Sequence, residues 1–112
     1  MEIAAERQDR VLSVHVSGRI DAGNASEFEK TVRSAIEDGD RTVIVNFENL
    51  RFISSTGLRV VLMTAKSLRR RDAAFALCSL SGAVLEVFRT SGFDKIIAIH
   101  PTRADALASL ER

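Results

Sequence analysis

Short runs of β-branched residues alternate along this chain with longer segments of helical periodicity, and this alternation constrains the fold more than any other feature. Residues 42–47 and 73–78 are nearly continuous apolar runs, which is typical of strands buried on both faces. Each run is flanked by segments whose apolar residues recur at intervals of three and four. A helix that connects two parallel strands of one sheet makes a right-handed crossover. The pattern therefore predicts an α/β fold with a parallel sheet at its centre.

A pair of strand patterns precedes this core. Residues 11–17 alternate apolar and polar side chains, which is typical of a half-buried strand. Residues 2–6 form a weaker strand candidate, and the connection between the two is polar. Neighbouring strands with a short polar connection predict an antiparallel hairpin, and we expect Gly18 to end its second strand.

The two central helical segments carry end signals and apolar faces. In residues 21–39, Ser26 and Glu29 have the spacing of a capping box, and Gly39 is placed to end the helix. The next helix follows a hydroxyl-rich turn at residues 54–56. Its apolar side chains fall on one stripe: Leu58, Val61, Leu62, Ala65 and Leu68.

The C-terminal third completes the alternation. Ser81 can cap a third helix that stops at Gly92, and residues 96–99 form a last short strand. Thr102 and Asp105 have the spacing that opens a C-terminal helix. The predicted order is β-β-α-β-α-β-α-β-α: about four helices on a mixed sheet with a parallel core and an N-terminal hairpin.

Length and composition limit the classes of protein. A chain of 112 residues corresponds to one domain, which we expect to span residues 1–112. Sixteen basic and fifteen acidic residues leave a formal net charge of +1, and the chain has no Trp or Tyr for stacking bases. No apolar run approaches the about 20 residues of a membrane span, and the single Cys78 is typical of a reducing compartment. We expect a cytoplasmic protein without direct nucleic-acid binding or membrane insertion.

Residue types that carry catalysis are sparse. His15 and His100, the only histidines, have no second His or Cys at the spacing of metal ligands. The chain has neither a G-x-S-x-G nucleophile elbow nor a Gly-rich phosphate loop. We therefore expect a protein that is not an enzyme and that uses no cofactor or metal.

The turn between the third strand and the second helix carries the clearest functional signal. Ser54, Ser55 and Thr56 precede Gly57 where a helix is predicted to begin. Unpaired backbone N–H groups and the helix dipole favour anions there, so a phosphate could be bound or covalently attached. The alternative is that one hydroxyl caps the helix and has no further role.

Three stretches resemble motifs of one family. Residues 52–58 (Phe-Ile-Ser-Ser-Thr-Gly-Leu) resemble a signature that runs aromatic, apolar, Asp, Ser, Ser or Thr, Gly, Leu. Residues 18–21 (Gly-Arg-Ile-Asp) resemble its Gly-x-Leu/Ile-Asp turn, and residues 87–93 (Val-Phe-Arg-Thr-Ser-Gly-Phe) resemble its Leu-Phe-x-x-Ser/Thr-Gly-Leu/Phe stretch. The family is that of the STAS-domain anti-sigma factor antagonists. The resemblance spans nearly the whole chain and implies a STAS-type single domain.

The resemblance implies a partner switch in transcriptional signalling. In the family, the unphosphorylated protein binds an anti-sigma factor that is also a serine kinase and releases its sigma factor. Phosphorylation blocks that binding, and a PP2C-type phosphatase resets the switch. By position, Ser55 is the phosphoacceptor, with Thr56 as second choice. Ser54 stands where the family has an acidic residue, so this site has one negative charge fewer.

The predicted partner-binding residues are Asp21, Ser54, Ser55 and Thr56, which match family positions, together with Gly57 at the helix start and Arg59 in the basic tract. A turn or N-cap role for Asp21 is an equal alternative, and the basic residues at 59–71 form either a solvated face or a docking surface. Two other functions stay open. One is a constitutive structural STAS subunit of a transporter-associated or stress-sensing assembly, and the other is a domain that binds a nucleotide or small anion.

Overall fold

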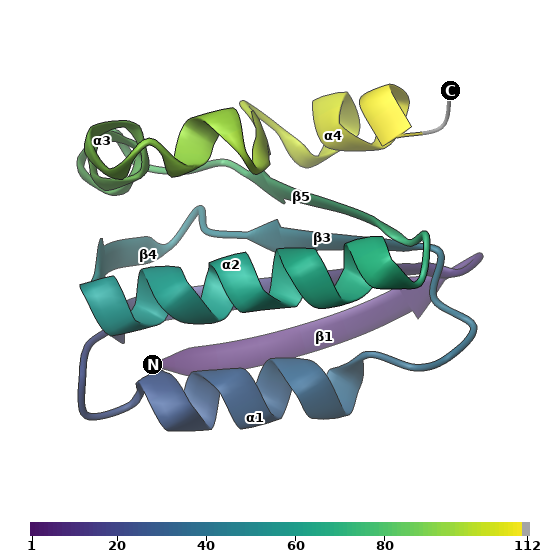
Figure 1. Ribbon diagram of the computed structural model, residues 1–112, viewed down its shortest axis with the longest axis horizontal. Helices are drawn as coiled ribbons and strands as arrows, with labels where there is room; N and C mark the ends of the chain where they lie inside the picture. The colour runs from purple at the N-terminus through teal and green to yellow at the C-terminus, as the bar shows by residue number, and fades with distance from the viewer. Residues whose placement is uncertain (111–112) are drawn as a thin grey trace.

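The computed structural model describes residues 1–110, which contain six strands, four α-helices and one 3₁₀ turn (Figure 1). In chain order these are β1 (Glu2–Gln8), β2 (Val11–Ile20), α1 (Ala25–Ala35), β3 (Thr42–Asn46), β4 (Leu50–Ile53), α2 (Ser55–Arg70), β5 (Ala74–Cys78), α3 (Gly82–Ser91), η1 (Phe93–Lys95), β6 (Ala98–His100) and α4 (Arg103–Leu110). None of these helices is long and apolar enough to cross a membrane.

The strands form one mixed sheet. Its order is β1-β2-β3-β5-β6, in which β1 and β2 are antiparallel and the other neighbours are parallel. The carboxyl ends of the parallel strands therefore meet at one edge. This arrangement confirms the predicted α/β fold with a parallel core and an N-terminal hairpin.

Helices cover both faces of the parallel core, which explains the continuous apolar runs. α1 and α2 lie side by side over one face (Figure 1), where Val43 and Val45 of β3 join the main core. The intervening Ile44 points to the other face and packs against Ala106 of α4. Alternate residues of β3 thus enter different cores, and both need apolar side chains.

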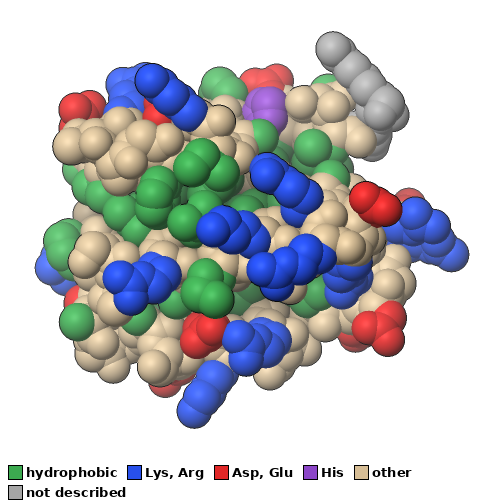
Figure 2. Space-filling view, in the orientation of Figure 1, with side chains coloured by type: hydrophobic (Ala, Val, Ile, Leu, Met, Phe, Trp, Pro, Cys, Tyr) green, Lys and Arg blue, Asp and Glu red, His purple; other side chains and the backbone are tan. Residues whose placement is uncertain are grey.

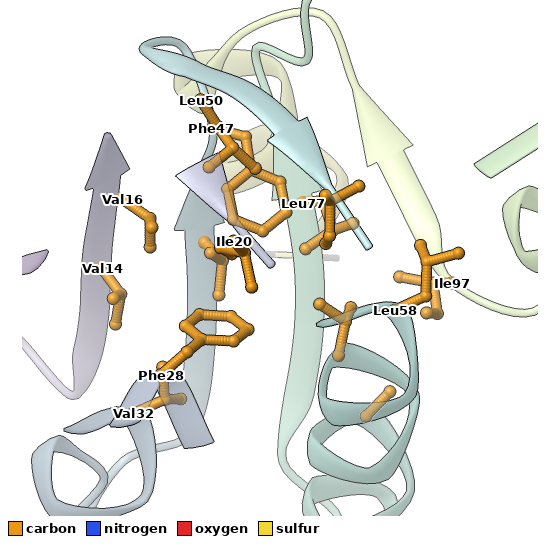
Figure 3. Packing of buried hydrophobic residues seen from close by; sticks show 14 of the residues in the cluster. Val14, Val16, Ile20, Phe28, Val32, Phe47, Leu50, Leu58, Leu77 and Ile97 are labelled. Atoms are coloured by element: carbon orange, nitrogen blue, oxygen red, sulfur yellow. The ribbon is translucent and has the colours of Figure 1, made fainter. Parts of the chain in front are cut away.

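The main core is built around large side chains from several elements (Figure 3). Phe28 of α1, Phe47 after β3 and Leu77 of β5 are each at most 2% exposed. Burying one side chain of this size contributes about 1.5–3 kcal/mol to folding. Leu58 and Leu68 from the predicted stripe of α2 lie in the same core, as that pattern required.

The predicted order of elements was wrong in one respect, because it lacked the strand β4 between β3 and α2. Residues 50–53 pair in parallel with the end of β2, through Leu50, Phe52 and Ile53. The strand has only four residues, and its middle pair is exposed, so it has no continuous apolar run. Its short length and mixed exposure explain why the sequence pattern did not indicate it.

Four predicted element ends also move. α1 begins at Ala25 and ends at Ala35, so the expected capping box at Ser26 and Glu29 does not form at its start and Gly39 lies beyond its end. Gly18 does not end β2 but lies within it at φ +91°, next to a shift in the β2–β4 register. The last strand begins at Ala98, because the residues before it form η1 and a turn. The predicted caps Ser81 and Gly92 of α3 are confirmed.

A buried carboxylate ties β1 to the connection between α1 and β3. Asp40 is 2% exposed, and its carboxylate accepts hydrogen bonds from Nε and Nη2 of Arg7 at 2.6 and 2.9 Å. These hydrogen bonds from the guanidinium hold the pKa of the Asp40 carboxyl below its ordinary value, although burial acts in the opposite direction. Arg71 Nη2 donates to the carbonyl oxygens of Glu37, Asp38 and Asp40, so the same loop is also tied to the end of α2.

Candidate functional site

The candidate site lies at one edge of the sheet, where two neighbouring strands end. Ile20 of β2 and Ile53 of β4 are register partners. The residues that follow them, Asp21 and Ser54, therefore leave the sheet side by side. The Ser54 N–H donates to the carbonyl oxygen of Ile20 at 2.8 Å, which holds the start of α2 against the end of β2.

Ser54 is the N-cap of α2. Its backbone is extended (φ −83°, ψ 170°), and its Oγ accepts a hydrogen bond from the Gly57 N–H at 3.2 Å. Its Oγ also lies 3.2 Å from Oγ1 of Thr56, within hydrogen-bonding distance. The capping role that the sequence left open among three hydroxyls therefore belongs to Ser54, and Thr56 is coupled to it.

Ser55 is the first residue of α2, and it is exposed. Among residues 1–110, its hydroxyl has no hydrogen-bond partner, in contrast with Ser54 and Thr56. It lies at the positive end of a 16-residue helix that has no acidic residue in its first turn. Of the three hydroxyls, that of Ser55 is therefore exposed and not hydrogen-bonded within the described residues, whereas those of Ser54 and Thr56 are hydrogen-bonded.

Gly57 lets the start of α2 approach the sheet. A Cβ at this position would lie 2.8 Å from Cγ2 of Ile20 and 2.8 Å from Cγ1 of Ile53, closer than real Cβ contacts. The adjacent Leu58 is buried in the core. Gly57 therefore acts on the site through the position of its backbone, and because it is buried it offers little surface to a partner.

Asp21 makes a local turn ahead of α1. Its Oδ1 accepts from the backbone N–H of Gly23 at 2.9 Å and of Asn24 at 3.1 Å. The Asn24 side chain in turn accepts from the Asp21 N–H at 2.8 Å. The turn role that the sequence offered for Asp21 is therefore present, and the residue is still exposed beside Ser54.

A cation–aromatic pair at this edge was not predicted from the sequence. Cζ of Arg19 lies 4.4 Å from the centroid of the Phe52 ring, and the two residues are register partners on β2 and β4. Phe52 is 38% exposed, so the pair lies on the surface next to Asp21 and Ser54. Recognising β4 as a strand would have revealed the pair, because the register with β2 sets Arg19 opposite Phe52.

The other surroundings of the site are apolar or basic. A shallow hollow beside Leu58 is lined by Ala83, Val87 and Thr90 of α3. Arg59 lies one turn after Ser55 on α2 and is exposed. Within residues 1–110, no three His, Cys, Asp or Glu side chains gather closely enough to hold a metal ion.

The six predicted site residues thus lie around one strand edge and one helix start of an α/β domain. The family model of the STAS domain matches residues 2–106. The chain belongs to the STAS domain family, which confirms the resemblance carried by the three motifs.

Relatives from other bacteria cover nearly the same length. BtrV of Bordetella bronchiseptica, provisionally assigned as an anti-sigma factor antagonist, is 34% identical over 111 residues, 99% of this chain and 96% of BtrV. A crystal structure of an anti-sigma factor antagonist from Mycobacterium paratuberculosis has a TM-score of 0.91 and 25% identity, covering 99% of this chain and 94% of that one. The antagonist SpoIIAA in its unphosphorylated form has a TM-score of 0.81 and 25% identity, covering 98% and 96%.

Proposed function

We propose that this protein is an anti-sigma factor antagonist that acts by partner switching. In its unphosphorylated form it binds an anti-sigma factor serine kinase and releases the sigma factor, and phosphorylation of Ser55 blocks that binding. One observation carries the proposal: Ser55 is the exposed hydroxyl without an internal partner at the start of α2, whereas Ser54 caps the helix.

The relatives support the general activity. BtrV and the M. paratuberculosis protein are both named for antagonism of an anti-sigma factor. SpoIIAA has been solved in an unphosphorylated and in a phosphorylated form. A phosphorylated form of a protein with this fold supports a switch by the same modification here.

Phosphorylation would act at the interface and leave the fold intact. A phosphoserine carries about −1.5 to −2 charges at neutral pH. At the positive end of α2 this charge is locally favourable. In a docked complex it would have to be desolvated close to the kinase's own nucleotide phosphates and carboxylates, and like charges across an interface cost several kcal/mol. A PP2C-type phosphatase would restore the binding form.

The surface around Ser55 has both an acidic and a basic side chain that a partner could contact. The exposed carboxylate of Asp21 can face a basic group of the kinase, and Arg59 can face an acidic one. Because Ser54 replaces the family's acidic residue, the start of α2 lacks a fixed negative charge. The negative charge beside it is that of the exposed Asp21.

An Asp21→Asn variant removes that charge, so it should weaken kinase binding while changing thermal stability little.

Intact-mass spectrometry of the protein from its native cells tests the modification. We expect a fraction heavier by one phosphate, mapped to Ser55, that disappears in Ser55→Ala and persists in Ser67→Ala, a matched exposed serine on the same helix. A phosphate mapped to Thr56 would move the switch by one residue. Absence of phosphate under all growth conditions, with a partner bound constitutively, would contradict the switch and favour a structural STAS subunit.

A further inference from the structure

The outward face of α2 carries a continuous row of exposed side chains that we call the α2 stripe. Its members follow one another at intervals of four, three and four residues: Arg59, Met63, Lys66 and Arg70. This spacing places them along one side of the helix, in line with Ser55 at its start. From Ser55 to Arg70 the helix rises about 22 Å, so the stripe extends well beyond the phosphoacceptor.

The stripe concentrates positive charge. α2 contains four basic residues and no Asp or Glu, in a chain whose formal net charge is only +1. The ion pairs formed among residues 1–110 use Arg7, His15 and Arg33, so the cations of α2 have no internal carboxylate partner. Figure 2 shows Lys and Arg side chains gathered across the middle of the face on which α2 lies.

A hollow with both polar and apolar lining runs beside the second half of the stripe, between α1 and α2. Ile36 contributes apolar surface to it, while Arg33, which is paired with Glu29, and Arg70 contribute polar surface. Met63 also lines the hollow and is 55% exposed, the largest exposure of a large hydrophobic side chain among residues 1–110. An unbranched, polarizable side chain in this position can adapt to an apolar group of a partner.

We propose that the α2 stripe and this hollow bind an acidic amphipathic helix of a protein partner. Its carboxylates would face the unpaired cations of α2, and one apolar side chain would enter beside Met63, which is the helix-in-groove mode of recognition. The exposed Met63 among the cations favours a protein over a nucleic acid, and the chain has no Trp or Tyr to stack bases. The low net charge disfavours a purely electrostatic membrane contact. The proposal goes beyond the switch at Ser55 and does not require its phosphorylation.

A synthetic helical peptide tests this surface directly. The probe has Glu on one face and Leu on the other, with about 16 residues to match the length of α2. By NMR and fluorescence anisotropy at low salt, we expect amide shifts along residues 59–70. The double variant Lys66→Glu/Arg70→Glu should weaken binding by roughly tenfold or more, and Met63→Ser should weaken it as well.

Matched controls separate docking from non-specific attraction. Arg89→Glu/Lys95→Glu makes the same charge change at exposed residues of α3 and η1, and it should leave peptide affinity within about twofold. A peptide with Lys in place of Glu should not bind. Ser55→Ala should bind the acidic peptide like the wild type, which keeps a failure here distinct from a failure of the switch.

Three results would overturn the inference. One is the absence of peptide binding, and another is equal binding by Lys66→Glu/Arg70→Glu, with melting temperatures showing that the variant is folded. The third is tighter binding of α2 to a DNA duplex or to vesicles that contain anionic lipid than to the peptide. That result would show that the α2 stripe binds polyanions and not an acidic helix of a protein.

Discussion

At the scale of single residues, three adjacent hydroxyls at the start of α2 have three different environments. Ser54 accepts the capping hydrogen bond, Thr56 is within hydrogen-bonding distance of Ser54, and Ser55 faces outward. The difference follows from the extended backbone of Ser54, which turns its side chain back toward the helix N–H groups. A protein kinase would therefore meet one hydroxyl that it can modify without breaking an internal hydrogen bond.

The first prediction compares the two serines by alanine substitution. Ser54→Ala should lower the free energy of unfolding by about 0.5–2 kcal/mol, because it removes the N-cap. Ser55→Ala should change it by less than about 0.5 kcal/mol, and should still bind the partner without being switched off. Urea unfolding of both variants measures the difference. If Ser55→Ala is the more destabilising, Ser55 is a structural residue, and loss of partner binding in that variant would make its hydroxyl a contact.

Glycine substitutions test the close approach of α2 to the sheet. Gly57→Ala places a Cβ 2.8 Å from two isoleucine carbons, and we expect a net loss of about 1–2 kcal/mol after the better helix propensity of Ala is counted. Gly82→Ala is the matched control at the start of α3, where no atom lies within 4 Å of the new Cβ apart from its chain neighbours and the backbone of its own helix. It should be neutral or stabilising by about 0.5 kcal/mol. Thermal unfolding that ranks the variants in the opposite order would contradict the packing argument.

At the scale of elements, the sequence predicted the strands that have a regular hydrophobic pattern and missed β4, which has none. β3 and β5 were indicated by continuous apolar runs, because both of their faces are covered. β4 was missed, since two of its four residues are exposed. The start of α1 was misplaced, because the hydrogen bonds of Asp21 depend on backbone geometry that the Ser26–Glu29 spacing does not contain.

The candidate site, too, was predicted from the sequence only in part. The hydroxyl turn at a strand end and helix start was predicted, because residue type and local order are both visible in the chain. The identity of the capping hydroxyl was not, since it depends on the dihedral angles of Ser54. The Arg19–Phe52 pair was not predicted either, since it depends on the register between two strands.

The loop between α1 and β3 gives a prediction about pH. The pKa of Asp40 is lowered in the folded protein by the hydrogen bonds from Arg7, so its contribution to stability is present above the unfolded pKa, about 3.9. That contribution is lost as the pH falls through the folded value. Asp40→Asn should therefore be less stable than the wild type by about 1–3 kcal/mol at pH 7, and the difference should shrink in strong acid.

Denaturant unfolding at neutral and acidic pH measures this difference. Asp38→Asn is the control, because Asp38 lies in the same loop but is exposed. The Asp38→Asn curve should follow the wild type at both pH values. A constant gap between Asp40→Asn and the wild type across this range would show that the carboxylate does not stabilise the fold through its charge.

At the scale of the whole molecule, charge is balanced in sum but unevenly distributed. The formal net charge is +1, yet α2 has only basic charges and begins at an exposed serine. A phosphate on Ser55 would thus be added at the head of a positive surface. The effect within the chain and the effect on a docked partner should therefore have opposite signs.

Calorimetry on matched phosphorylated and unphosphorylated samples tests both signs. Phosphorylation should raise the stability of the free protein by about 0.3–1 kcal/mol, from the helix dipole, and should abolish binding of the kinase. Ser55→Asp should reproduce this only in part, because it has one charge and fewer acceptor oxygens. A melting temperature lowered by many degrees on phosphorylation would show that the switch acts through the fold.

The short pairing of β4 with β2 determines where the site should open when the protein is destabilised. Only Leu50, Phe52 and Ile53 hold β4 in register, across an irregularity, whereas β1, β3 and β5 are joined by longer ladders. Structures open locally where such pairing is sparse. Amide hydrogen exchange should therefore be faster in β4 than in β3, and mild denaturant should separate Asp21 from Ser54 before the sheet unfolds. A weakened mutant would then lose recognition of its partner while most of its secondary structure remained.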